Sequence, residues 1–257
     1  MATEPILIAI VGETASGKSA LALELAQHFN GEIVCADSRT AYQGMDIGTV
    51  KPSVADRHLI KHHLLDVAAP DQKFNVAQFK TLANEAITDI SKRSKLPIMV
   101  GGSGLYVDSI LFDYRFDDKN AARNEQNPRH LKAGDQTDRT QLRENTLAIG
   151  LVIPQEELRQ RVETRVEHMV EAGLLEEVAQ LAEKYGWGAP GLQSIGYQEC
   201  QAYLNGDQKL EETKQQIVQH TLSYAKRQRT WFKRNKSIHW LTDPSQAVAL
   251  MTTFLNK

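Results

Sequence analysis

Residues 12–19 read Gly-Glu-Thr-Ala-Ser-Gly-Lys-Ser, and this stretch decides the fold. Two glycines five positions apart, followed by Lys and Ser, match the pattern of a phosphate-cradling loop. Residues 6–11 are apolar and rich in β-branched side chains, which predicts a buried strand. Residues 20–29 predict a helix whose inward side chains are Leu21, Leu23, Ala26 and Phe29. A strand, a glycine loop and a helix in this order are what the motif requires, so we expect phosphate or pyrophosphate to bind here.

The chemistry of this loop follows from its backbone. Glycines allow successive N–H groups to point into one concavity, and the N-terminus of the following helix adds a partial positive charge. Lys18 is long enough to reach outer phosphate oxygens, and the Ser19 hydroxyl is placed to ligate Mg²⁺. The residues expected to bind the diphosphate are Gly12, Thr14, Ala15, Ser16, Gly17, Lys18 and Ser19. The loop alone does not identify the reaction.

Composition restricts the class of protein. The 257 residues are enough for one large core with an appendage, and the net charge of −2 means that any nucleic-acid binding needs a local basic patch. We find no signal-peptide pattern and no apolar run long enough for a membrane span. Cys35 and Cys200 have no metal-binding spacing, which favours reduced thiols and a cytoplasmic location.

Two further predicted strands end in polar or small residues. Residues 32–38 form a strand that ends in Asp37 and Ser38, and residues 96–100 form one followed by Gly-Gly-Ser-Gly. Ligands of open parallel sheets sit beyond the carboxyl ends of the strands, so we expect Asp37 near the phosphate loop. Its role is catalytic or metal-associated, with a helix cap or an outer magnesium shell as the alternatives.

The second of these strands lacks the Asp that NTP-hydrolysing proteins with such loops usually place there for Mg²⁺. This argues against a plain ATPase or GTPase. It favours an enzyme whose site opens to a second, bulky substrate.

Between and beyond these strands, the pattern predicts a functional loop over residues 39–52, a helix over 74–91, a strand over 145–153 and a long helix over 155–184 with a break at Gly173. On that long helix, Arg161, Arg165 and His168 share a face, which is either solvated beside Glu partners or aligned for anion contacts. The adjacent His62 and His63 have no third ligand nearby, so zinc is disfavoured.

Residues 213–242 contain no acidic residue. Basic and aromatic side chains alternate there: Tyr224, Lys226, Arg227, Arg229, Trp231, Phe232, Lys233, Arg234, Lys236 and Trp240. This mixture suits a nucleic-acid strand, with charge for the backbone and rings for stacked bases. Equally, Trp231 and Phe232 are candidates for the core of the last helix.

Taken together, these segments resemble the tRNA dimethylallyltransferases, also called tRNA isopentenyltransferases. The matching stretches run in family order and cover most of the chain outside 113–145. They are residues 12–19, 37–42, 44–49 with 51–52, 62–64, 101–106, 165–178, 193–197 and 224–232.

The resemblance implies transfer of a dimethylallyl group from dimethylallyl diphosphate to the N6 amine of the adenosine 3′-adjacent to the anticodon, with release of pyrophosphate. It implies catalytic roles for Asp37, Lys18 and Ser19, with Asp37 accepting a hydrogen bond or proton from the amine and Mg²⁺ on Ser19. The tRNA-binding residues would be Asp37, Ser38, Arg39, Thr40, Ser103, Arg123, Asn127, Arg129, Lys226 and Arg227. The partners are the anticodon stem-loop of tRNA and the donor, and we expect a monomer that does not bind membranes.

Three departures from the family pattern stand out. Glu13 replaces a usual Pro, which we expect to be tolerated at a loop surface. Leu222 replaces a usual Arg associated with the pyrophosphate, and Arg161, Arg165 and Lys226 are candidates to compensate for it. The helical insertion that helps grip the anticodon stem-loop is reduced to a polar stretch over residues 113–144.

The predicted fold is therefore an α/β, P-loop nucleoside-triphosphate-hydrolase-like parallel sheet with helices on both faces. Residues 1–112 and 145–257 form the catalytic core, and residues 113–144 form a reduced insertion. Two alternatives stay open. A small-metabolite kinase would turn over ATP, which the missing strand-end Asp disfavours. A non-catalytic RNA-binding relative would fit Leu222 and the short insertion, but not the retention of Lys18, Ser19 and Asp37.

Overall fold

The computed structural model describes residues 4–114, 116 and 142–256. Six parallel strands form one sheet in the order β3-β2-β4-β1-β5-β6. The strands are β1 (Leu7–Gly12), β2 (Gly31–Cys35), β3 (His62–His63), β4 (Leu96–Gly101), β5 (Thr146–Leu151) and β6 (Ile238–Leu241). Every residue of β1 is buried, as expected for a central parallel strand covered on both faces. The predicted parallel sheet is confirmed.

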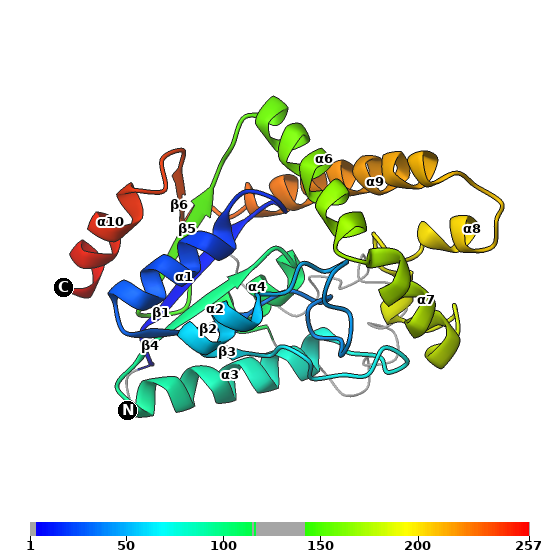
Figure 1. The fold of residues 1–257 in the computed structure, drawn as a ribbon. Helices are drawn as coiled ribbons and strands as arrows, with labels where there is room; N and C mark the ends of the chain where they lie inside the picture. The colour runs from blue at the N-terminus through cyan, green and yellow to red at the C-terminus, as the bar shows by residue number, and fades with distance from the viewer. Residues whose placement is uncertain (1–3, 115, 117–141, 257) are drawn as a thin grey trace.

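Helices cover both faces of this sheet (Figure 1). Leu7, Ala9 and Val11 of β1 pack on one side with α3 (Val76–Lys92) and α4 (Gly104–Leu111). Ile8 and Ile10 pack on the other side with α1 (Lys18–His28) and α10 (Gln246–Leu255). Because successive side chains of a strand alternate between faces, one apolar run serves both layers. The helix α10 was not predicted from the sequence.

A separate helical layer extends beyond the carboxyl ends of the strands, on the right of Figure 1. It contains α6 (Gln155–Glu171), α7 (Leu174–Tyr185), α8 (Cys200–Leu204) and α9 (Leu210–Phe232), with its own apolar core. The helix predicted over 155–184 is divided at Gly173, whose φ of 98° lies in the left-handed region that favours glycine. The short helix α2 (Val54–Leu59) and the 3₁₀ turn η3 (Gly191–Gln193) complete the chain that is described.

The predicted loop over residues 39–52 consists of turns and one isolated bridge. His63 pairs with Glu32 at 2.7 Å, and the described residues contain no group of three or more His, Cys, Asp or Glu that could hold a metal. None of the helices described is long and apolar enough to cross a membrane. Most of residues 113–144 lie outside the described residues, so the boundary of the reduced insertion stays a prediction.

Candidate active site

The phosphate loop joins the end of β1 to the start of α1 and has the backbone that its glycines predict. Gly12 has a φ of 152°, and a Cβ there would lie 3.1 Å from Ser16 Oγ and 3.2 Å from a backbone carbonyl of β5. Gly17 has a φ of 91° at the N-cap of α1. The Ser16 hydroxyl is buried and has no hydrogen-bond partner among the described residues. A buried, unpaired hydroxyl in a loop of this shape fits an anion-binding role.

Lys18 is the first residue of α1, and its side chain reaches back to the loop. Its Nζ donates a hydrogen bond to the backbone carbonyl of Glu13 at 3.1 Å. Burial lowers the pKa of Lys18 to about 8, with Arg165 adding to the effect and Asp37 opposing it. These three groups therefore lie within electrostatic reach of one another. Ser19 is exposed at the start of α1.

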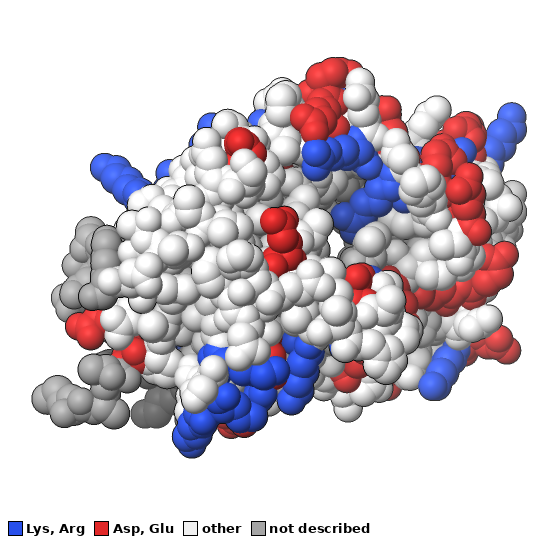
Figure 2. Space-filling view, turned by 60° about the vertical axis from the view of Figure 1, so that its left-hand side comes forward, with Lys and Arg blue, Asp and Glu red and all other residues white. Residues whose placement is uncertain are grey.

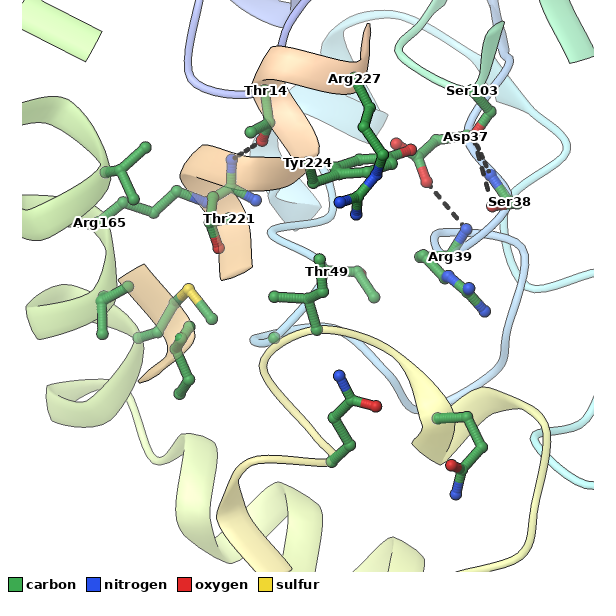
Figure 3. A pocket seen from close by; sticks show the side chains of 18 of the residues that line it. Thr14, Asp37, Ser38, Arg39, Thr49, Ser103, Arg165, Thr221, Tyr224 and Arg227 are labelled. Carbon is green, nitrogen blue, oxygen red and sulfur yellow. Dashed lines mark hydrogen bonds between the residues drawn. The ribbon is translucent and has the colours of Figure 1, made fainter. Parts of the chain in front are cut away.

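A cavity of about 600 Å³ opens beside the loop (Figure 3). It lies at the carboxyl ends of β1, β2 and β4, where the sheet topology brings distant segments together. Its polar lining includes Thr14, Asp37, Ser38, Arg39, Thr49, Ser103, Arg165, Thr221, Tyr224 and Arg227. Its apolar lining includes Val162, Val166, Met169, Ile195 and Ile217. The cavity therefore has a polar region beside the loop and an apolar wall from α6 and α9.

The structure brings some of the predicted residues to this cavity, whereas Lys18, Ser19 and the other predicted loop residues except Thr14 are not part of its lining. Asp37, Ser38, Arg39, Ser103 and Arg227 line it together with Thr14. Thr40 and Lys226 do not line it, and Lys226 is exposed on α9. Arg123, Asn127 and Arg129 lie outside the described residues. Thr49, Val166, Met169 and Ile195 lie within stretches that resemble the family but were not predicted as site residues, and Val162, Ile217 and Thr221 lie outside those stretches.

Asp37 is held by its own chain. One carboxylate oxygen accepts a hydrogen bond from the Arg39 backbone N–H at 2.8 Å. The neighbouring Ser38 N–H donates to Ser103 Oγ at 3.0 Å, which ties the ends of β2 and β4 together. Figure 3 shows Asp37 beside Tyr224 and Arg227 of α9. Among the described residues the second carboxylate oxygen has no hydrogen-bond partner, so it can accept a proton or a hydrogen bond in the cavity.

The helix α9 clamps the phosphate loop from the other side. Gln228 accepts a hydrogen bond from the Thr14 N–H at 2.8 Å and donates one to the Gly102 carbonyl at 2.9 Å. Arg229 donates to both carboxylate oxygens of Glu13, at 2.8 and 3.0 Å. Glu13 is only 3% exposed, so its predicted place at a loop surface is wrong. The sequence could not reveal this because Arg229 is more than 200 positions away.

Three of the aromatic residues of the basic region pack or bond within the protein, and one faces the cavity. Phe232 is buried in the core, Trp231 donates to Asp108 at 2.9 Å, and Trp240 belongs to β6 and packs against Gly150. Only Tyr224 faces the cavity, with the Arg227 guanidinium 5.6 Å from its ring centre. Among these aromatic side chains, Tyr224 is therefore the one that remains a candidate to stack on a nucleic-acid base.

Residues 39–52 form the wall of the cavity opposite the phosphate loop. Glu177 of α7 accepts hydrogen bonds from the backbone N–H groups of residues 46, 47 and 48 and from the Tyr197 hydroxyl. The buried Lys51 donates to the Tyr42 carbonyl, Asp46 and Asp66. A Cβ at Gly48 would lie 2.4 Å from the Tyr197 ring, so only glycine fits there. These hydrogen bonds within the protein hold the wall in shape.

The charge on the surface is uneven despite the small net charge. Figure 2 shows Lys and Arg side chains gathered in a hollow on one face, with acidic side chains around it, and a second basic group at the lower edge. Local basic patches therefore exist on a chain whose net charge is −2. Such patches can attract a polyanion without a basic protein overall.

Fold and loop together define an α/β protein of the P-loop type with a cavity beside its phosphate loop. Comparison with known proteins specifies this class. The family described as IPP transferase matches residues 40–144 and 126–235. The tRNA dimethylallyltransferase of Staphylococcus epidermidis is 34% identical over 309 residues, covering 99% of this chain and 93% of that protein. The Staphylococcus aureus enzyme of the same name is 33% identical, covering 96% of each.

Solved structures give the same result. The crystal structure of tRNA delta(2)-isopentenylpyrophosphate transferase from Staphylococcus epidermidis superposes with a TM-score of 0.84 at 34% identity, covering 98% of this chain and 99% of that one. The tRNA isopentenylpyrophosphate transferase of Bacillus halodurans gives 0.82 at 31% identity, covering 98% and 96%. The chain belongs to the tRNA dimethylallyltransferase family, also called the IPP transferases.

Proposed function

We propose that this chain transfers a dimethylallyl group from dimethylallyl diphosphate to the N6 amine of the adenosine 3′-adjacent to the anticodon in tRNA, releasing pyrophosphate. The observation that carries this function is the cavity lined by both Thr14 of the phosphate loop and Asp37, with Lys18 within electrostatic reach of Asp37. Membership of a family whose relatives are named for this reaction supports it.

The reaction divides between two groups of residues. A C–N bond forms between the adenine amine and the first prenyl carbon, while the C–O bond to the diphosphate breaks and its electrons leave with pyrophosphate. Lys18 and the loop N–H groups stabilise the charge that develops on this leaving group. Asp37 accepts the proton released by the amine, which is a poor nucleophile and benefits from a base aimed at it.

Magnesium fits this site as an ion that arrives with the diphosphate. The described residues offer no carboxylate-rich cage, and Ser19 supplies one exposed hydroxyl at the end of the loop. Mg²⁺ typically takes one or two protein ligands and completes its shell with phosphate oxygens and water. Bound through Ser19, it would neutralise negative charge on the diphosphate.

The acceptor side is assigned to the residues that follow β2 and β4. Ser38, Arg39, Thr40 and Ser103 would contact the RNA near the reacting base, and Lys226 and Arg227 would contact its backbone. The adenosine must leave its stack to reach the donor carbon in the cavity. Arg123, Asn127 and Arg129 remain proposed tRNA contacts of the short insertion. We further propose that the protein acts as a monomer in the cytoplasm.

A transfer assay tests this function directly. Purified protein, Mg²⁺ and dimethylallyl diphosphate are mixed with an anticodon stem-loop that has adenosines 3′ of the anticodon, and the digested RNA is analysed by mass. We expect one added five-carbon unit on the adenosine adjacent to the anticodon, and none when guanosine replaces it. Binding of stem-loop and whole tRNA without product would indicate a non-catalytic relative, and ATP turnover would indicate a kinase.

A further inference from the structure

The phosphate loop and Asp37 follow strands that are not neighbours in the sheet, because β4 lies between β1 and β2. The backbone ladder between β1 and β4 ends at the pair Val11 and Gly101. Beyond that pair, no backbone–backbone hydrogen bond among the described residues joins residues 13–19 to residues 102–104. A side chain is therefore needed to hold the loop against the end of β4.

Gln228 of α9 supplies this bridge. Its side-chain carbonyl accepts a hydrogen bond from the Thr14 N–H at 2.8 Å, and its side-chain N–H donates to the Gly102 carbonyl at 2.9 Å. Gln228 is only 4% exposed, so both bonds are shielded from water. A side-chain amide offers an acceptor and a donor as a peptide unit does, so Gln228 replaces one step of a backbone ladder. A Cβ at Gly102 would lie 2.2 Å from the Gln228 amide nitrogen, so glycine is needed for this contact.

The end of β4 connects this bridge to Asp37. Ser103, the residue after the bridged carbonyl, accepts a hydrogen bond at Oγ from the Ser38 N–H at 3.0 Å. Ser38 directly follows Asp37, and Figure 3 shows Ser103, Ser38 and Asp37 together on one side of the cavity. Gln228 and Ser103 are thus the two links between the phosphate loop and the residue proposed as the base.

The neighbouring Arg229 makes a contact of a different kind. It also holds the loop, by donating to both carboxylate oxygens of Glu13, but none of its side-chain hydrogen bonds among the described residues reaches β4. Consecutive residues of α9 therefore fix consecutive residues of the loop, Glu13 by its side chain and Thr14 by its backbone. Within the part of the chain that is described, Gln228 is the side chain that bonds to both the loop and the end of β4.

We propose that Gln228 is a positioning residue for prenyl transfer, which sets the separation between a diphosphate on the phosphate loop and the Asp37 carboxylate. The inference rests on the proposed function, because that function requires the leaving group and the base to act on one reacting centre. A displacement of about 1 Å between the two sides can cost about 10²-fold in rate while each substrate still binds.

Gln228→Met tests this role, because methionine keeps the length of the side chain but makes neither hydrogen bond. Transfer assays should show a kcat that is lower by at least about tenfold, with both KM values within about threefold of the wild type. Titration calorimetry with inorganic pyrophosphate and Mg²⁺ should likewise give an affinity within about threefold of the wild type. If Gln228→Met does not fold, Gln228→Asn takes its place with the same expectations, since its shorter side chain cannot span both partners.

Thr213→Val is the matched control. Thr213 belongs to the first turn of α9, is 1% exposed and donates a hydrogen bond to the Lys209 carbonyl, so its loss weakens the same helix far from the cavity. This variant should unfold at a lower temperature than the wild type. Its kcat should nevertheless stay within about threefold of the wild type.

Hydrogen exchange measured by NMR follows the bridge without turnover. The amides of Thr14 and Ser38 donate the bonds at the two ends of the connection. Both should exchange faster by at least about tenfold in Gln228→Met, and by less than about threefold in Thr213→Val. Faster exchange at Ser38 would show that the effect travels through β4 and is not confined to the loop.

The proposal is wrong if Gln228→Met keeps the wild-type kcat, if its pyrophosphate affinity falls as far as its kcat, or if its Ser38 amide exchanges at the wild-type rate. An equal loss of kcat in Thr213→Val would also overturn it, since weakening α9 alone would then explain the result. A wild-type protein that transfers no prenyl group, but whose Ser38 exchange depends on Gln228, would overturn the proposed function and leave the bridge standing.

Discussion

The two walls of the cavity use their polar groups in opposite ways. In the donor wall, which is the phosphate loop with Arg165, Ser16 Oγ has no hydrogen-bond partner among the described residues, and Arg165 donates to the neutral Thr14 hydroxyl. In the acceptor wall, which is residues 39–52, Glu177 accepts four hydrogen bonds and Lys51 donates three. The donor wall thus has polar groups that a ligand could still bind, although its Glu13 and Thr14 are bonded to α9, whereas the acceptor wall uses its polar groups in hydrogen bonds within the protein.

This difference follows from what each wall must hold. A diphosphate carries many charged oxygens, and a ligand of this kind can satisfy unpaired donors. A flipped base offers few polar atoms, so the groups that receive it must already be in position. The comparison predicts that acceptor-wall variants lose stability, whereas donor-wall variants lose diphosphate affinity.

The largest effect is expected at Asp37, where the two walls meet. Asp37→Ala should lower kcat by a factor of about 10²–10⁴, the usual range for a general base, and leave RNA binding nearly intact. Single-turnover transfer assays and filter binding measure the two quantities. Asp37→Asn is the control of equal size. Equal losses of binding and transfer would show that Asp37 has a structural role.

Variants of the acceptor wall should lower the free energy of unfolding. Glu177→Ala leaves three backbone N–H groups and the Tyr197 hydroxyl without their acceptor, and we expect a loss of about 3 kcal/mol in the free energy of unfolding. Urea denaturation measures this loss, and the KM for RNA should rise. Pyrophosphate affinity should stay at the wild-type value in the folded fraction. A loss of pyrophosphate affinity instead would contradict the division between the walls.

The Glu13–Arg229 pair belongs to the donor wall, but its two side chains bond to each other. We therefore expect its variants to lose stability, as variants of the acceptor wall do. Glu13→Gln leaves a partly buried guanidinium short of its carboxylate, so we expect a loss of about 2 kcal/mol in stability. Arg229→Gln should cost a similar amount, and the double variant should cost less than the sum. Thermal unfolding of all four proteins completes this cycle. Strict additivity would mean that the two side chains are not coupled.

The smallest effect is expected at the rim, where Arg227 lines the cavity from α9 while remaining exposed. Arg227→Gln should weaken RNA binding by less than tenfold and reduce the slope of log affinity against log salt by about 0.7, as for one lost phosphate contact to a single strand. Lys226→Gln, outside the cavity lining, tests whether the contact depends on position. An unchanged slope in both variants would remove α9 from the RNA surface.

Much of the donor wall was predictable because its signals are local. The spacing of Gly12, Gly17 and Lys18 specifies a loop conformation within eight residues, and the structure has that conformation. Asp37 was placed correctly because a residue just beyond a buried parallel strand lies at the ligand-binding edge of the sheet. The family resemblance then implied the reaction in which these residues take part.

The sequence by itself determined the parallel α/β fold, the phosphate loop and the residue that ends β2, since each depends on periodicity or spacing within a short segment. Only the tertiary structure decided that Glu13 is buried under Arg229, that Arg165 and not Arg161 reaches the cavity, and that Glu177 shapes residues 46–48. These outcomes depend on which side chains meet after distant helices pack. Arg161 and Arg165 are equivalent in the sequence pattern, and only their neighbours in the folded protein decide that Arg161 pairs with Glu157 while Arg165 lines the cavity.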